Sequence, residues 1–270
     1  MNGLERKMVD LLVDLKTNYH VTSVKAEFEA EGTRMEEAMR LKEVSMKAGL
    51  DMTIKVGGCE ALKDMFEAAS LGTKSLVAPM VESAFALRKY LGAVRVAFPE
   101  DLRREMDFYV NIETITACQN FDAMLALPEI GELSGVVIGR HDLTASLDLP
   151  VDAVNSVRVQ QLALDVAAKA HACGLKVVVG GAVSAASMPF FRGFPAGHLS
   201  KFETRKIVFS CPGALHNPDL AFLKAVEFEI DWLKNKRLYY SAIDSESDAR
   251  LRVMEARYQK SIDLMHAKKA

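Results

Sequence analysis

The chain has 270 residues, half of them hydrophobic, and a formal net charge of −2 at pH 7. This length suits one large domain, and the apolar content is sufficient for a substantial buried core. A charge so close to neutrality provides no electrostatic basis for binding nucleic acid or an anionic membrane surface. No segment approaches about 18 uncharged apolar residues, so we expect no membrane-spanning helix.

The N-terminus and the cysteines both indicate an intracellular protein. Residues 1–16 are too charged for a secretory signal peptide. The cysteines are widely spaced and form no CxxC pair, which argues against zinc fingers and favours reduced thiols. They are Cys59, Cys118, Cys173 and Cys211. We therefore expect a cytoplasmic protein.

After an amphipathic helix at residues 3–16, strand-like and helix-like segments alternate along the chain. The strand candidates are residues 21–28, 52–56, 75–78, 110–114, a run that begins at 135, 176–179 and 206–209. The helix candidates are residues 35–47, 59–71, 82–91, 116–127, 154–172 and helices from about 219 onward.

This alternation predicts a parallel α/β sheet covered by helices, and α/β barrels commonly have this length. Seven strands are clear, and Val94–Phe98, which is short and interrupted by an arginine, is a candidate for the eighth. We expect a single domain over residues 1–270, in which 217–270 form a helical C-terminal extension. The charged segment 245–270 either packs on a neighbouring subunit or forms a solvated terminal helix.

Two of the strand candidates end in a carboxylate, Glu113 and Asp142. The two residues are 29 positions apart, the length of one strand-helix-strand repeat, so they should occupy neighbouring points on the rim where ligands bind. Mg²⁺ typically takes one or two carboxylates together with waters and substrate oxygens. Spacing alone leaves two interpretations open: a metal site, or Asp142 as a helix N-cap and Glu113 in a rim salt bridge.

Three segments resemble the HpcH/HpaI aldolase and citrate lyase β-subunit family: residues 77–83 (VAPMVES), 111–114 (NIET) and 138–147 (IGRHDLTASL). The likeness extends over roughly residues 21–211. It implies a (β/α)₈ TIM barrel and a homo-oligomer, a trimer or hexamer. It also implies that Glu113 and Asp142 bind Mg²⁺, or Mn²⁺ or Co²⁺. The substrate that it implies is a pyruvate-like 2-oxo acid, or a phosphoenolpyruvate or acyl-CoA relative.

Lys55 lies at the end of a strand, where the family usually has an arginine beside the enolate oxygen. A lysine keeps the charge but loses the bidentate fork. Three roles remain open: stabilising the enolate charge, forming a Schiff base, or a structural role in which the side chain extends out of the barrel or pairs with Glu27. The diglycine Gly57-Gly58 follows, and such a turn permits close backbone approach to an anion, so both glycines are candidates for substrate binding. A tight turn alone explains them equally well.

The proton-transfer group is the main departure from the family, whose aldolases often carry a histidine directly after the equivalent of Glu27. This chain has Phe28 there. We predict that His141 replaces it, because an imidazole suits proton transfer at neutral pH, with Glu27 as a second catalytic candidate. A structural role for His141 stays open.

Arg140 and the backbone N–H groups near His141 and Asp142 are further candidates for substrate binding. Arg140 could meet a substrate carboxylate or phosphate, or form an inter-subunit salt bridge instead. The backbone groups could receive a carboxylate. Lys25, Glu27 and Glu29 alternate on one face of a strand, which in a barrel means the interior or the rim.

We therefore expect a metal-dependent aldolase or lyase that makes or breaks a carbon–carbon bond through the pyruvate-type enolate of a 2-oxo acid. One alternative is a lyase or transferase that uses phosphoenolpyruvate or an acyl-CoA. Another is a catalytically inactive barrel that serves as a binding subunit. No GxGxxG or Walker pattern occurs, so nucleotide cofactors are not expected.

Overall fold

The computed structural model describes residues 1–216 and 218–267, with side chains up to residue 260. Its contacts divide the chain into two compact units, Met1–Glu229 and Ile230–Ala270. The first unit contains every strand and all the site residues predicted from the sequence. The second consists of the later part of a long helix. The assignment of the whole chain to a single domain stays a prediction.

The first unit is a closed eight-stranded barrel whose strands follow one another in chain order. The strands are β1 (Val21–Glu27), β2 (Asp51–Lys55), β3 (Ser75–Ala78), β4 (Asp107–Ile112), β5 (Gly135–Gly139), β6 (Lys176–Gly180), β7 (Lys201–Glu203) and β8 (Ile207–Ser210). The predicted α/β barrel is therefore confirmed.

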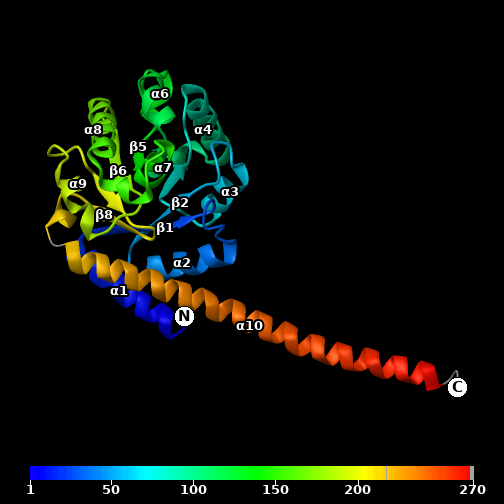
Figure 1. The fold of residues 1–270 in the computed structure, drawn as a ribbon. Coiled ribbons are helices and arrows are strands. Elements are labelled where there is room, and N and C mark those ends of the chain that lie inside the picture. The colour runs from blue at the N-terminus through cyan, green and yellow to red at the C-terminus, as the bar shows by residue number, and fades with distance from the viewer. Residues whose placement is uncertain (217, 268–270) are drawn as a thin grey trace. The chain divides into compact units, whose positions relative to one another are not determined.

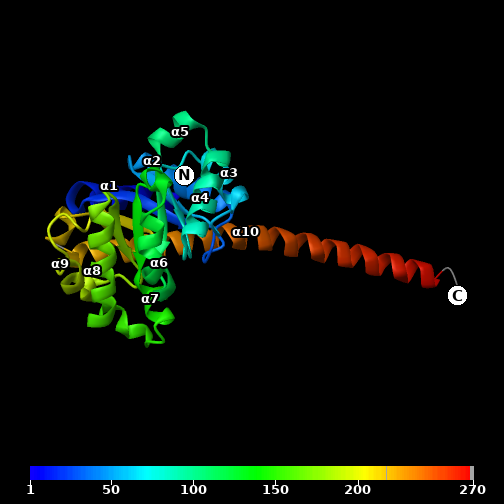
Figure 2. The same ribbon diagram turned by 90° about the horizontal axis from the view of Figure 1, so that it is seen from above.

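Helices surround the barrel, and α4, α6 and α8 stand side by side on its outside in both ribbon views (Figures 1 and 2). The α-helices are α1 (Gly3–Tyr19), α2 (Met35–Lys47), α3 (Leu62–Ser70), α4 (Ala84–Ala97), α5 (Glu100–Glu105), α6 (Ile115–Leu125), α7 (Arg140–Ser146), α8 (Val157–Ala172), α9 (Met188–Arg192) and α10 (Pro218–Ala267). Short 3₁₀ turns are η1 (Pro128–Glu132), η2 (Val151–Asn155), η3 (Ala185–Ser187) and η4 (Gly213–Leu215). The C-terminal helices expected from the sequence are one continuous helix over the described residues.

The eighth strand is not where the sequence pattern placed it. Val94–Phe98 belongs almost wholly to α4, in which Leu87, Leu91 and Val94 are buried at helical spacing. Ser83 starts this helix, because its side chain accepts a hydrogen bond from the N–H of Ala86. The true additional strand is β7, which the sequence analysis missed.

The expected strand-helix alternation also fails between β7 and β8. Only residues 204–206 connect these strands, and β8 pairs antiparallel with both β7 and β1. The remaining neighbours pair parallel. At this point the carboxyl-end rim of the barrel therefore carries a tight hairpin turn in place of a strand-helix loop.

The barrel interior changes from apolar to polar toward the carboxyl ends of the parallel strands. Val77, Tyr109, Val137 and Val178, from β3 to β6, form a buried apolar cluster. Two residues further along three of these strands lie Asn111, Gly139 and Gly180, on the same face because side chains alternate.

The two glycines of this polar level make room for carboxylates. A Cβ on Gly139 would lie 2.7 Å from Oε2 of Glu113, and a Cβ on Gly180 would lie 3.2 Å from Oε1 of Glu203. Small residues here let two glutamates enter the barrel mouth.

Among the described residues, no helix has both the length and the apolar character needed to cross a membrane. All four cysteines are free thiols.

Candidate active site

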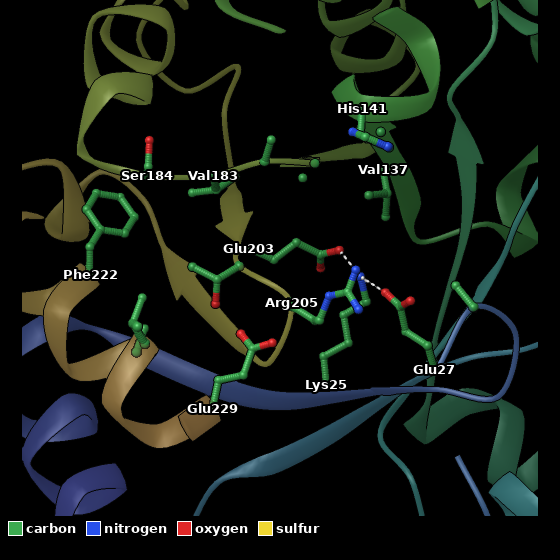
Figure 3. Close-up of a pocket in the computed structure, with 18 of the residues that line it drawn as sticks. Lys25, Glu27, Val137, His141, Val183, Ser184, Glu203, Arg205, Phe222 and Glu229 are labelled. Atoms are coloured by element: carbon green, nitrogen blue, oxygen red, sulfur yellow. Dashed lines mark hydrogen bonds and ion pairs between the residues drawn. The ribbon is translucent and has the colours of Figure 1, made fainter. Parts of the chain in front are cut away.

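A cavity of about 1070 Å³ opens at the carboxyl end of the barrel (Figure 3). It is lined by the strand ends, the loop after β6, the β7–β8 hairpin and the first turns of α10. Its ionisable lining residues are Lys25, Glu27, Lys55, Glu113, His141, Asp142, Glu203, Arg205, Asp219 and Glu229. Five of the predicted site residues are therefore brought together here: Glu27, Lys55, Glu113, His141 and Asp142.

Glu113 is the most deeply placed of the acids, directly after β4 and only 1% exposed. Its Oε1 accepts a hydrogen bond from the Met80 N–H at 2.9 Å, and its Oε2 accepts one from Nδ2 of Asn111 at 2.7 Å. Met80 presents its N–H from a left-handed backbone conformation (φ 51°), which costs free energy in a non-glycine residue. The fold thus holds this carboxylate in place at some energetic cost.

Glu113 nevertheless lacks full compensation for its charge. Burial raises the pKa of Glu113, the nearby charge of Asp142 raises it further, and the opposing effects of Lys55, the Met80 N–H and Asn111 do not offset these two. A carboxylate with a raised pKa next to a second carboxylate is the arrangement that a bound cation would stabilise.

Asp142 is half-buried in the first turn of α7 and faces the same cavity. The N-cap of α7 is Gly139 and no side chain caps this helix, so the N-cap interpretation of Asp142 is wrong. The described residues contain no group of three or more histidine, cysteine or acidic side chains arranged to hold a metal ion. A cation bound here would take its remaining ligands from water or substrate, as Mg²⁺ commonly does.

Asn111 is a site residue that the sequence analysis missed. Its Oδ1 is buried and has no hydrogen-bond partner, while the residue lines the cavity. A buried acceptor without a donor is costly unless a ligand supplies one. A signal for Asn111 existed in the sequence, because a residue two positions before Glu113 points to the same side of a strand.

Lys55 is buried. Its Nζ forms ion pairs with Oε2 of Glu29 at 2.8 Å and with Oε2 of Glu113 at 3.8 Å. Burial alone would lower the pKa of Lys55, but the charges of Glu113 and the neighbouring glutamates outweigh it, and the pKa is raised. The amine is therefore protonated at neutral pH, which favours electrostatic stabilisation over Schiff-base chemistry.

Glu27 lies beside a second buried lysine, Lys25. The Lys25 Nζ is 3.0 Å from Oε1 of Glu27 and 2.5 Å from Oε1 of Glu203, and Figure 3 shows it between the two carboxylates. Burial would raise the pKa of Glu27, but the charge of Lys25 lowers it below its ordinary value. Glu27 is thus held as a carboxylate. The sequence analysis missed Glu203 because it did not predict β7, the strand that ends at this residue.

His141 lies on the cavity wall, and its exposed side chain forms no hydrogen bond or ion pair with any residue whose side chain the structure describes (Figure 3).

Gly57 and Gly58 do not line the cavity. The N–H of Gly57 donates to Oδ2 of Asp64 at 2.7 Å, which ties the turn to α3. Substrate binding by these two glycines stays a prediction, and this geometry favours a structural turn.

Arg140 is completely buried and is not among the residues that line the cavity. Its guanidinium donates four hydrogen bonds, to the carbonyls of Gly180 and Gly181, to Asn155 and to Ser187. It also packs over the rings of Phe190 and Phe191. Burial lowers the pKa of Arg140 to about 10. This environment favours a structural role over the predicted contact with substrate.

Comparisons with known proteins place the fold among solved structures. No family model matches the sequence, and no curated protein matches it. An HpcH/HpaI aldolase from Desulfitobacterium hafniense superposes with a TM-score of 0.58 at 16% identity over 75% of this chain and 83% of its own. An HpcH/HpaI aldolase/citrate lyase family protein from Burkholderia cenocepacia superposes with a TM-score of 0.56 at 13% identity, over 90% of this chain and 99% of its own.

The citrate synthase SbnG superposes with a TM-score of 0.52 at 14% identity over 69% of this chain and 79% of its own. At these identities the likeness shows a common fold. The structural neighbours are thus proteins of the family that the three sequence segments resemble, together with a related synthase.

Proposed function

We propose that the protein is an enzyme of the HpcH/HpaI aldolase and citrate lyase type, which makes or breaks a carbon–carbon bond beside the carbonyl of a 2-oxo acid. The observation that carries this proposal is the pairing of Glu113 and Asp142 at one end of the barrel, in a large cavity, with the pKa of Glu113 raised. The neighbours include an aldolase and a citrate synthase by name, which supports carbon–carbon bond chemistry.

The residues present fit a divalent cation. Glu113 and Asp142 would hold Mg²⁺, or Mn²⁺ or Co²⁺, because their mutual repulsion and the raised pKa of Glu113 are relieved by positive charge. The unpartnered Oδ1 of Asn111 adds an uncompensated acceptor to the same wall. When bound, the ion would supply Lewis-acid stabilisation of negative charge on a substrate oxygen.

Lys55 contributes a fixed positive charge to the same region. It stays protonated because Glu113 and Glu29 raise its pKa against the effect of burial, and it is anchored at 2.8 Å to Glu29. A preorganised cation of this kind stabilises negative charge that develops on the substrate carbonyl. It takes the place of the family arginine without the bidentate fork.

His141 is the group with the freedom to move a proton. Its two ring nitrogens have no partner among the described side chains, and the residue faces the cavity from the helix that carries Asp142. Glu27 is the weaker candidate, since Lys25 holds it as a carboxylate with a lowered pKa. We assign proton transfer at the substrate carbon to the His141 imidazole.

The experiment that tests this function needs no knowledge of the second reactant. Exchange of the pyruvate methyl protons with D₂O, followed by NMR, reports removal of a proton beside the carbonyl. We expect exchange when dialysed protein receives Mg²⁺, Mn²⁺ or Co²⁺, and its loss in Glu113→Gln and Asp142→Asn. Asp165→Asn, a surface change on α8, is the matched control. Full exchange without divalent ions, or in Glu113→Gln, would contradict the proposal.

The homo-oligomer implied by the sequence resemblance, a trimer or hexamer, stays a prediction. Light scattering on the purified protein measures it directly.

A further inference from the structure

Among the residues whose side chains the structure describes, one cation that lines the cavity has no carboxylate in contact with it. Lys25 is paired with Glu27 and Glu203, and Lys55 with Glu29 and Glu113. Arg205 also lines the cavity, but it forms no hydrogen bond or ion pair with any residue whose side chain the structure describes. Its charge acts on Glu27 only at a distance, as one of several contributions that lower the pKa of that carboxylate.

Arg205 projects from a rigid support. It is the middle residue of the three-residue turn between β7 and β8. On one side, Thr204 closes the turn: its N–H donates to the Ile207 carbonyl at 2.9 Å, and its Oγ1 accepts from the Ile207 N–H at 3.1 Å. On the other side, Lys206 is buried and ion-paired with Glu31, and its carbonyl accepts the Lys25 N–H at 2.8 Å. The guanidinium is therefore carried on an anchored backbone.

The wall contributed by α10 is of a different kind. Phe222, Leu223 and Val226 of this helix line the cavity, and Val183 lies in the lining segment that follows β6. Figure 3 shows Phe222 and Val183 on one side of the cavity and Arg205 on another. A ligand that packs against the apolar wall of α10 and also pairs with Arg205 has a hydrocarbon portion and an anionic end.

We propose that Arg205 binds an oxyanion group, a carboxylate or a phosphate, carried by the reactant that is joined to or released from the 2-oxo acid. The guanidinium fork matches the two oxygens of either group. Assignment of this group to the second reactant rests on the proposed function, whereas the anion site itself does not. Because the hairpin replaces a strand-helix loop, this specificity residue comes from a connection that a regular barrel lacks.

Two acids on α10, Asp219 and Glu229, face the same cavity and oppose an anion. Figure 3 shows the Glu229 carboxylate on the side of Arg205, although the two form no ion pair among the described contacts. Removing the charge of Glu229 should therefore strengthen anion binding, whereas removing that of Arg205 should weaken it. Because the two substitutions should change anion binding in opposite directions, the test distinguishes a specific anion site from a general loss of binding.

The test is calorimetric titration of dialysed, metal-free protein in a buffer without carboxylates, using succinate and glycerol 3-phosphate as probes and butane-1,4-diol as the uncharged control. We expect the wild type to bind at least one anion more tightly than the diol. Arg205→Gln should weaken that binding about tenfold or more, and Arg205→Lys should weaken it less. Glu229→Gln should tighten it roughly twofold. Arg158→Gln, an equal charge change on α8 outside the cavity, should match the wild type.

Equal binding of the anions and the diol by the wild type would overturn the proposal, as would equal anion binding by the wild type and Arg205→Gln. Circular dichroism establishes that each variant is folded, and Glu229→Gln keeps the test decisive if Arg205→Gln does not fold. Binding that depends on Arg205 in a protein without pyruvate exchange supports the anion site and removes the proposed function. Pyruvate exchange that depends on a divalent ion, in a protein whose anion binding does not depend on Arg205, supports the proposed function and removes the anion site.

Discussion

Lys25 and Glu203 are separated by 178 positions in the chain, yet the Lys25 Nζ lies 2.5 Å from Oε1 of Glu203. This ion pair joins β1 to β7 across the place in the barrel that β8 occupies between them. Both side chains are buried, and Glu27 shares the same ammonium at 3.0 Å. The carboxylates of Glu27 and Glu203 and the hairpin that carries Arg205 are thus organised around a buried lysine that takes no direct part in the proposed chemistry.

The first prediction concerns this lysine. Lys25→Met leaves Glu27 and Glu203 buried without their cation, so it should destabilise the protein by about 3–5 kcal/mol. Glu203→Gln keeps an acceptor beside Lys25 and leaves Glu27 as its partner, so its cost should be smaller. Urea unfolding followed by circular dichroism measures both. Lys63→Met, which breaks only the surface pair with Glu67 on α3, is the control and should leave the unfolding free energy nearly unchanged. A loss for Lys25→Met no larger than this control would refute the prediction.

The second prediction follows from the lowered pKa of Glu27. Because the folded-state pKa lies below its unfolded value, the contribution of Glu27 to stability is present above about pH 4.5 and is lost as the pH falls through the folded-state pKa. Glu27→Gln should therefore destabilise the protein at pH 7, and the difference from the wild type should shrink in acid. Unfolding free energies measured from pH 7 to pH 3 test this. A difference independent of pH would show that the charge of Glu27 is irrelevant.

The positions of Glu113 and Asp142 could be predicted because each follows an apolar run long enough to be recognised as a strand. The strand β7 has three residues, and Phe202 is the only apolar one, so no periodic pattern reveals it. Glu203 and Arg205 were missed with it. Val94–Phe98 shows the opposite error, since its valines suit a strand but the apolar spacing from Leu87 onward is helical.

The burial of Arg140 was not predictable for a different reason. Its acceptors lie on separate connections, with Asn155 in η2, Gly181 after β6 and Ser187 in η3. Their convergence on one guanidinium depends on the tertiary structure. An arginine beside two predicted site residues resembles a substrate ligand, whereas its four hydrogen bonds favour a structural role in which it links these loops.

The third prediction separates the two chemical roles of Lys55. As a fixed cation it should tolerate Lys55→Arg with measurable pyruvate exchange, whereas Lys55→Met should lose a factor on the order of 10²–10³, as when one oxyanion donor is removed. Treatment with borohydride and pyruvate, followed by mass spectrometry, should leave no adduct on the protein. A covalent adduct at Lys55 would replace electrostatic stabilisation with Schiff-base chemistry.

The fourth prediction tests the structural role of Arg140. Arg140→Met leaves the carbonyls of Gly180 and Gly181 without a buried donor, and Arg140→Lys cannot reproduce the four-way contact. Arg140→Met should cost about 3–5 kcal/mol of unfolding free energy, and Arg140→Lys a substantial part of this. Arg158→Lys on the exposed face of α8 should leave stability nearly unchanged. Normal stability of Arg140→Met combined with weakened pyruvate binding would restore the substrate-binding interpretation.

The last prediction concerns proton transfer by His141. If the imidazole removes or returns the proton at the pyruvate methyl group, His141→Asn should reduce exchange with D₂O by about 10²–10⁴-fold, the usual contribution of a general acid or base. Because the side chain is exposed on the cavity wall, free imidazole can reach the vacated space and should restore part of the exchange. His216→Asn, outside this cavity, should exchange as the wild type does and gain nothing from imidazole. Loss of exchange without rescue would leave His141 with a positioning role, and unchanged exchange would transfer the proton-moving role to Glu27 or to water.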